Sequence, residues 1–263
     1  MTEYLTICQN RICYDLGTLV TADLVEDSWG EKCLMTDLVA LPIPLWNSVS
    51  LRVFDGFMIK AAETSENECI LKTAEFAVLC DIDLRAATRQ MQIPCNVIAG
   101  ISIPNQNTRT DFFSVDPVRG GRRMILQEPF LRYSQGTNAR GVMPFPAELF
   151  KVNMKHTPMA YLYGRTLAYH KFMNLGKTNE DIIRVESICS YFGYDRMNGA
   201  FTRRLLEPFI RNMDALSDIF SYEWLDGLPK NYEYFLRSRL KITWHNYPRD
   251  LKYVAKRLKK RRV

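Results

Sequence analysis

The alternation of apolar and polar residues over the first hundred positions favours β-strands. The runs YLTICQNRICY, GTLVTADLV and SVSLRVFDGFMIKAA are separated by turn-forming segments such as EDSWGE and LPIPLWN. We therefore expect a strand-rich N-terminal domain over residues 1–120. Two interpretations stay open for this domain: an oligomerisation unit, or a divergent first winged helix.

One N-terminal segment, LKTAEFAVLCDIDLRAATRQMQ, has a helical pattern. Within it, residues 75–77, Ile82 and residues 86–89 have the outline of a helix-turn-helix motif. Asp81 stands where such turns favour glycine, so an ordinary amphipathic helix pair is the alternative. The later runs CNVIAGISI and RRMILQEPFLRYS are predicted as strands, and the polar segment PNQNTRTDFFSVDPVRGGRR between them as an exposed loop or domain boundary.

From about Pro144 the apolar spacing becomes helical. One helix is expected in TPMAYLYGRTLAYHKFMNL, with Thr157 as N-cap and Pro158 at its first position. A second is expected over residues 181–192 and a third over residues 200–218, joined by the short glycine-bearing segment GYDRMNG.

Two strands follow these helices, FSYEWL and LRSRLKITWHNY. Three helices followed by a β-hairpin is the order of a winged helix, which we assign to residues 121–250. The predicted fold class is therefore α+β. In the second strand the apolar residues alternate with basic ones, so the outer face of this wing is expected to contact DNA through Arg237, Arg239 and Lys241.

The third helix contains the stretch FTRRLLEPFIRNMDAL, whose apolar residues recur at helical spacing. If this stripe packs on the preceding helices, the polar side chains project from the other faces. Arginine is the commonest specific reader of bases because its fork matches the two acceptors of guanine. We expect Pro208 to kink the helix. The predicted DNA-reading residues of this recognition helix are Asn198, Thr202, Arg203, Arg204 and Arg211, with Asn212 also projecting.

A surface helix without a ligand is the alternative interpretation of this stretch. In that case Glu207 and Arg211 would form an i,i+4 ion pair worth only about 0.3 to 0.5 kcal/mol.

The charge distribution supports a polyanionic partner for the C-terminal part. Residues 1–150 contain 13 Lys and Arg against 18 Asp and Glu, whereas residues 151–263 contain 22 against 11, giving −5 and +11. The last fifteen residues hold eight Lys and Arg. Residues 251–263 are therefore predicted to be a basic tail that contacts phosphates without reading sequence, through Lys256, Arg257, Lys259, Lys260, Arg261 and Arg262.

Several C-terminal blocks together resemble a known family. TPMAYLYGRTLAYHKFMN, IIRVESICSYF, RRLLEPFIRNMDAL and YEYFLRSRLKITWHNYP are similar to the winged-helix region of replication-initiator proteins of bacterial plasmids and mobile elements. The resemblance covers about residues 140 to 250. It implies origin-type binding to double-stranded DNA by a protein built from two winged-helix domains, of which the first helps dimerisation.

Other functional classes receive less support from the sequence. No apolar run reaches about 18 residues and the N-terminus lacks the pattern of a signal peptide, so a cytoplasmic, nucleoid-associated protein without membrane contact is expected. The seven cysteines form no CxxC pair, and we expect them reduced and mostly buried, with no metal and no cofactor bound.

An enzyme is the least favoured class. His156, His170 and His245 are isolated from one another, and the tyrosines Tyr161, Tyr163 and Tyr169 lie in a helix that is typical of a core. Asp81 and Asp83 could share a nuclease metal, but they lie in a predicted turn, where aspartate is common. No phosphate-binding loop occurs.

The sequence thus predicts a non-enzymatic, sequence-specific binder of double-stranded DNA that acts as a replication initiator. Its expected partners are duplex DNA and host helicase or other replication proteins, and a homodimer is left open. A winged-helix transcriptional regulator is the first alternative, and a metal-dependent nuclease or strand-transfer enzyme is the second.

Overall fold

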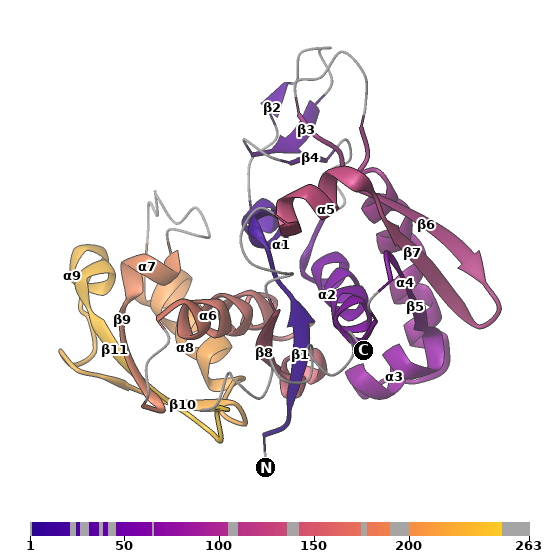
Figure 1. Cartoon of the computed structure of the whole chain (residues 1–263). Helices are drawn as coiled ribbons and strands as arrows, with labels where there is room; N and C mark the ends of the chain where they lie inside the picture. Colours follow the sequence, from indigo (N-terminus) through magenta and orange to yellow (C-terminus); the bar gives the residue numbers. More distant parts are fainter. Residues whose placement is uncertain are drawn as a thin grey trace. The chain divides into compact units, whose positions relative to one another are not determined.

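The computed structural model describes residues 2–21, 25–26, 32–36, 39–41, 46–64, 66–104, 110–135, 142–174, 178–189 and 200–248. Helices and small β-sheets alternate along this part of the chain, as expected for a mixed α and β protein (Figure 1). The α-helices are α1 (Arg11–Thr18), α2 (Ser48–Glu63), α3 (Thr73–Cys80), α4 (Leu84–Ala99), α5 (Glu128–Gln135), α6 (Ala160–Asn174), α7 (Val185–Cys189), α8 (Glu207–Asp214) and α9 (Tyr232–Arg237). Two 3₁₀ turns, η1 (Leu19–Thr21) and η2 (Ala147–Lys151), and one π-helical turn, η3 (Thr202–Leu206), complete the helical elements.

The strands form four small sheets. They are β1 (Tyr4–Cys8), β2 (Val25–Glu26), β3 (Lys32–Met35), β4 (Ala40–Leu41), β5 (Glu68–Lys72), β6 (Phe113–Val118), β7 (Gly121–Leu126), β8 (Val142–Pro146), β9 (Glu180–Arg184), β10 (Phe220–Trp224) and β11 (Arg239–Trp244). The sheet orders are β1-β8, β2-β3-β4, β5-β7-β6 and β10-β11-β9.

The described residues fall into two compact units. Unit 1 contains residues 2–5 and 144–248, and unit 2 contains residues 6–143. The domain boundary expected at residue 120 would lie inside a hairpin, because β6 and β7 pair with each other from Phe113↔Leu126 to Val118↔Gly121. This hairpin is part of unit 2, so the first domain is longer than expected.

Unit 2 combines the sheet β5-β7-β6 with α2, α3 and α4. Its order along the chain is helix, strand, helix, helix, strand, strand. The buried rings of Phe54 and Phe113 lie 5.5 Å apart between α2 and the sheet, so the core of this unit lies between the helices and one sheet face.

α2 corrects the expectation of a strand in SVSLRVFDGFMIKAA. The Asn47 side chain accepts hydrogen bonds from the backbone N–H groups of Val49 (2.9 Å) and Ser50 (3.1 Å), which caps the start of the helix. All residues from Ser50 to Ile59 are buried. A helix that is buried on every side has no polar face, so the sequence carries no helical periodicity to detect.

Other predicted strands of unit 2 are also helical. CNVIAGISI lies mostly on α4, which continues through Pro94, and the end of RRMILQEPFLRYS forms α5. The first part of that run, RRMIL, is strand β7 as predicted. The expected loop PNQNTRTDFFSVDPVRGGRR supplies β6 and the turn that leads into β7.

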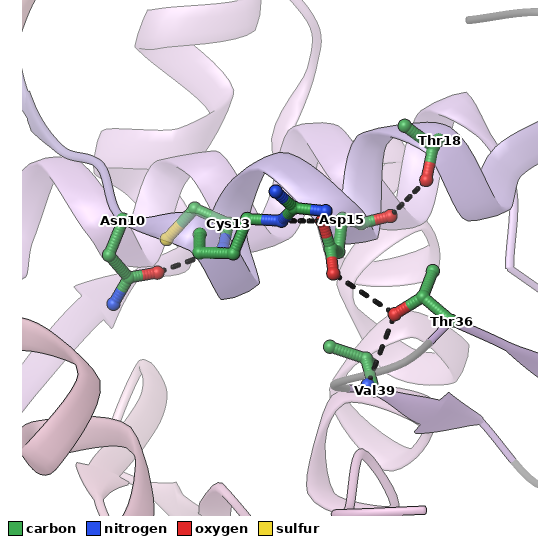
Figure 2. A network of polar contacts seen from close by, with 7 residues as sticks. Asn10, Cys13, Asp15, Thr18, Thr36 and Val39 are labelled. Atoms are coloured by element: carbon green, nitrogen blue, oxygen red, sulfur yellow. Dashed lines mark hydrogen bonds and ion pairs between the residues drawn. The ribbon is translucent and has the colours of Figure 1, made fainter.

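A polar network holds α1 in place within unit 2 (Figure 2). Asn10 caps the helix by accepting a hydrogen bond of 2.9 Å from the backbone N–H three residues later. The buried carboxylate of Asp15 accepts from Arg11 Nε at 2.7 Å and from the Thr36 hydroxyl at 3.0 Å, and that hydroxyl accepts in turn from the Val39 N–H. The run YLTICQNRICY, expected as one strand, therefore divides at Asn10 into β1 and α1.

Unit 1 confirms the predicted C-terminal hairpin. β10 and β11 pair antiparallel from Phe220↔Trp244 to Trp224↔Leu240. The apolar residues of β11 are buried and Arg239 is exposed, as the alternation in the sequence indicated. Leu236 and Arg237, expected in the same strand, belong instead to α9.

The predicted helix over residues 181–192 is wrong in its first half. Residues Glu180–Arg184 form β9, which pairs with β11, and the helix α7 begins only at Val185. Ile183 faces the core while Ile182 is exposed, the period of two that a strand requires. Because the run DIIRV suits either structure, the hydrogen bonds to β11 decide between them.

In unit 1 the order along the chain from α6 is helix, strand, helix, helix, strand, strand, with α9 inserted before the last strand. The helices α6, α7 and α8 accompany a sheet of order β10-β11-β9. Apart from α9, this is the order of elements that unit 2 also has. In both units the strand that comes last in sequence lies between the other two.

Candidate nucleic-acid interface

The predicted recognition helix of unit 1 contains a π-helical turn immediately before Pro208. The N–H of Glu207 donates to the carbonyl of Thr202, five residues back, whereas the N–H of Arg204 donates to Ala200, four residues back. Proline has no N–H for the usual i→i−4 bond and its ring clashes with that carbonyl, so the wider turn accommodates it. A widened turn at Thr202–Leu206 therefore precedes α8, and such turns are one of the recognised causes of the helix kink expected near Pro208.

This turn presents three consecutive polar residues to solvent. Thr202, Arg203 and Arg204 are exposed, and Arg211 is exposed on α8. Within the described residues no acidic side chain forms an ion pair with Arg203, and the expected alternative pair between Glu207 and Arg211 is not formed. Arg203 and Arg211, two of the residues predicted to read DNA, therefore keep their hydrogen-bond donors available to a ligand.

The other face of the same helix is held by packing. Leu205, Leu206 and Met213 are buried, and the ring of Phe209 lies 5.3 Å from that of Tyr163 on α6. The apolar stripe therefore packs against α6, as predicted.

Asn212 does not project as expected. It is buried, its Oδ1 accepts from the N–H of Met159 (3.0 Å), and its Nδ2 donates to the carbonyl of Pro208 (2.6 Å). Asn212 therefore joins α8 to the start of α6 and is not a reader. Asn198 lies outside the described residues.

The three predicted wing cations each have an acidic partner. Arg239 binds the carboxylate of Asp226 through Nη2 at 2.7 Å and Nε at 3.2 Å, and this contact lowers the pKa of Asp226. Lys241 Nζ lies 2.9 Å from Glu180 on the neighbouring strand β9.

Arg237, placed on α9, pairs with Glu233 one turn earlier at 3.0 Å. Because the strand residues Arg239 and Lys241 each lie beside a carboxylate, the outer face of this sheet carries less unpaired positive charge than the sequence suggested.

In unit 2, α3 and α4 are joined by a tight turn in the segment where the sequence outlined a helix-turn-helix only weakly. α3 ends at Cys80, Asp81 has the left-handed backbone (φ 53°) that such turns require, and α4 follows. Asp83 caps α4 by accepting from the N–H of Ala86 at 2.7 Å. The unusual aspartate at the glycine position was therefore compatible with the motif, because aspartate tolerates this conformation better than most residues.

Helix α4 exposes a polar stripe along one side. Successive positions at helical spacing place arginines, amides and a threonine on this face: Arg85, Thr88, Arg89, Gln92 and Asn96 are exposed. Arg85 and Arg89 form no ion pair with any described residue. These are the residue types that hydrogen-bond to base edges and phosphates. None of them was predicted from the sequence to contact DNA.

The β6–β7 hairpin of unit 2 is also basic at its tip. The strands are joined by Arg119 and Gly120, which has a positive φ of 74°, and Arg122 follows. Gly121 approaches the neighbouring strand closely, since a Cβ there would lie 2.9 Å from Lys72 Cα. Unit 2 thus has both an exposed basic helix and a basic hairpin.

The tyrosine, histidine and aspartate side chains considered as catalytic groups lie in a helix and a turn of the fold. Tyr161 and Tyr163 are fully buried on α6, and burial lowers the pKa of His170. Asp81 and Asp83 lie in the α3–α4 turn, where Asp83 is the helix cap. The part of the chain that the structure describes contains no cluster of three or more acidic, histidine or cysteine residues that could hold a metal ion.

Six cysteines behave as small buried hydrophobic residues. Cys8, Cys13, Cys69, Cys80, Cys95 and Cys189 are free and buried. Burial raises the pKa of Cys80 to about 11 and that of Cys189 to about 12, which keeps these thiols protonated at neutral pH.

Two further expectations concern the tail and the membrane. The basic tail, with Lys256, Arg257, Lys259, Lys260, Arg261 and Arg262, lies outside the described residues. In the described ranges, every helix is too short or too polar to cross a membrane.

Comparison with known proteins supports a fold but no sequence family. No family model and no curated protein sequence matches the chain. The structure is similar to a solved one described as a Pi initiator protein in complex with iteron DNA, with a TM-score of 0.54 and 11% sequence identity. The similarity covers 92% of this chain and 98% of that one, so it includes both units. The resemblance to initiator proteins inferred from the sequence is thereby confirmed at the level of the fold.

Proposed function

We propose that the protein binds double-stranded DNA sequence-specifically and acts as a replication initiator of a plasmid or other mobile element. Each unit is proposed to be a winged helix, a fold in which helix, strand, helix, helix, strand and strand follow one another and the last strand is central. The arrangements α2-β5-α3-α4-β6-β7 and α6-β9-α7-α8-β10-β11 both fit this description.

One observation carries the proposal. Helix α4 and the helix at 201–214 occupy the same place in the order of the two units, and no described acid forms an ion pair with the exposed Arg85 of the first or Arg203 of the second. The second helix of a helix-turn-helix is the one that enters the major groove, with its N-terminal residues at the base edges. Arg85 and Arg203, both near the start of their helices, are proposed to read bases.

The fold likeness to a Pi initiator protein in complex with iteron DNA supports the same assignment. Two reading helices in one chain would recognise a longer site than one helix can, and a site longer than one helical turn is rarer in a genome. Binding of several copies would then distort the duplex and recruit a host helicase. Bending a site costs on the order of 1 to 6 kcal/mol, which many phosphate contacts can offset.

Selection of bound duplexes from a random library, followed by binding measurements, tests the proposal. We expect a defined recurring sequence. Arg203→Ala and Arg85→Ala are each expected to weaken binding to it by about 1 to 3 kcal/mol and to relax preference at different base positions. Lys151→Ala in unit 1 and Arg132→Ala in unit 2 replace exposed cations outside these helices and serve as controls. Equal binding to all duplexes by the wild type would refute the proposal.

Initiation and transcriptional regulation differ in a second assay. A replicon that carries the gene and the selected repeats should be maintained in a host only with the wild-type protein, whereas a regulator would only change transcription from these repeats. We further propose that the protein is not itself an enzyme. Supercoiled DNA incubated with the protein and magnesium or manganese should stay intact, and nicking lost on substitution of His170 or Asp83 would instead favour the nuclease alternative.

A further inference from the structure

The segment between β10 and β11 distinguishes unit 1 from unit 2. In unit 2 the last two strands are joined by a tight turn at Arg119 and Gly120. In unit 1 the corresponding connection spans residues 225–238 and contains α9 (Figure 1). We call residues 225–238 the wing connection. Its contacts indicate a defined structure with an exposed surface of its own.

Hydrogen bonds close the wing connection at its base. The carboxylate of Asp226 accepts from the backbone N–H of Arg239 at 3.0 Å as well as from its guanidinium. The N–H of Leu225 donates to the carbonyl of Arg239 at 3.0 Å. Arg239 therefore has a structural role, because it joins the two ends of the wing connection.

Further side chains define the helix within the wing connection. Asn231 caps α9 by accepting from the N–H of Tyr234 at 3.0 Å, and the hydroxyl of Ser238 donates to the Tyr234 carbonyl at 2.7 Å. A segment ordered before binding loses less conformational entropy when it meets a ligand than a loose loop does.

An aromatic cluster fixes the wing connection beside the start of the recognition helix. The ring of Phe235 on α9 is fully buried and lies 5.9 Å from Phe201, 5.1 Å from Phe209 and 6.3 Å from Trp224. Phe201 immediately precedes the turn that exposes Thr202 and Arg203. The helix α9 of the wing connection therefore lies beside the end of the recognition helix that is proposed to meet the bases.

Two large apolar side chains and one lysine are exposed there. Leu228 is 62% and Tyr234 is 66% exposed, and Lys230 lies between them in sequence and is exposed. Among the described residues Lys230 has no ion-pair partner, in contrast to Arg237, Arg239 and Lys241. A cation without a partner beside apolar groups suits the sugar-phosphate backbone, where the cation meets phosphate and the apolar groups meet sugars.

We infer that the wing connection is a DNA-contacting surface in which Lys230 binds a backbone phosphate while Leu228 and Tyr234 pack on the adjoining sugars. This inference rests on the proposed function. It moves the wing contact from the sheet face to the exposed surface around α9. The contacted phosphates flank the bases read from residues 202 and 203.

Salt dependence and hydroxyl-radical footprinting test the inference on the full chain with the selected duplex. Lys230→Ala is expected to reduce the slope of log K against log salt by about 0.9, the contribution of one phosphate, and to weaken all duplexes equally. Leu228→Ala combined with Tyr234→Ala should remove protection of the sugars beside the main footprint. Arg239→Lys keeps the positive charge but cannot bind the Asp226 carboxylate through two nitrogens as arginine does. This variant therefore tests the structural role of Arg239.

Lys151→Ala, which removes an exposed lysine of η2 in the same unit, is the matched control and should leave slope and footprint unchanged. If the wild type binds a specific site but Lys230→Ala keeps the wild-type slope and the Leu228 and Tyr234 substitutions keep the flanking protection, the inference is overturned and the proposed function stands. If the wild type shows no preferred duplex, the proposed function fails as well. Circular dichroism of these exposed-site variants establishes that they fold.

Discussion

The buried ion pair of unit 1 gives a quantitative prediction about what holds the helices to the sheet. Lys171, near the end of α6, has a fully buried side chain whose Nζ lies 2.9 Å from the carboxylate of Asp181 on β9 and 2.7 Å from the carbonyl of Thr178. Asp181 is 12% exposed and also accepts from Trp244 Nε1 at 2.9 Å. These contacts join α6 to both β9 and β11.

Lys171→Met keeps most of the apolar volume and removes the charge. The Asp181 carboxylate then remains in a nearly dry site with one described donor, Trp244, because the ammonium that neutralised it is gone. Breaking a buried pair on one side costs about 3 to 5 kcal/mol. In Lys171→Met with Asp181→Leu no charge is buried, so the loss is limited to the N–H of Trp244 and the carbonyl of Thr178, each worth about 1 to 3 kcal/mol at most.

Urea unfolding, followed by tryptophan fluorescence and circular dichroism, measures these differences for the two single variants and the double variant. We expect a coupling free energy of about 2 kcal/mol or more, because the two losses are not independent. Lys151→Met, at an exposed position, should change stability by no more than about 0.5 kcal/mol. A loss below about 1 kcal/mol for Lys171→Met, or single losses that simply add in the double variant, would refute the reasoning.

Two further predictions concern a close approach of strands and a half-buried histidine. Gly121→Ala should abolish the β5–β7 pairing, since the new Cβ would lie 2.9 Å from Lys72 Cα and closer still to the Leu71 carbonyl. Gly120→Ala meets open space and should cost only about 1 to 2 kcal/mol of stability because of its positive φ. Thermal unfolding compares the two variants, and equal losses of stability would contradict the close approach at Gly121. Burial lowers the pKa of His170, an effect partly offset by Asp181. Below the unfolded pKa of about 6.5 the unfolded state therefore binds more protons, and stability should fall as the pH decreases from 7.5 to 5.5. In His170→Gln this part of the pH dependence of stability should disappear. A variant that loses stability with pH as the wild type does would show that His170 is not its source.

Local patterns in the sequence were sufficient for several elements. The alternation in RLKITW predicted the buried and exposed faces of β11, and the apolar stripe of residues 201–216 predicted which side of the helix at 201–214 packs on α6. The segregation of positive charge into residues 151–263 also needs no structure, because it is a property of composition alone. In each case the information lies in residues close together along the chain.

Where a segment of the sequence suits either a helix or a strand, only tertiary contacts decided which of the two it forms. DIIR became part of β9 because β11 offers it backbone hydrogen bonds, and α2 is a helix although the burial of every residue from Ser50 to Ile59 removes the periodicity that would reveal it. Neither the strand that precedes α7 nor the order of elements that the two units share could therefore be predicted from local patterns.

Tertiary structure also decided which cations remain available for a ligand. Lys241 meets Glu180 across two strands, 61 positions apart in sequence, and Arg239 meets Asp226 across the wing connection. The sequence determined how many positive charges the C-terminal part carries. Their pairing depends on distances between residues remote along the chain, which only the folded chain defines, because Coulomb attraction acts through space and falls with separation.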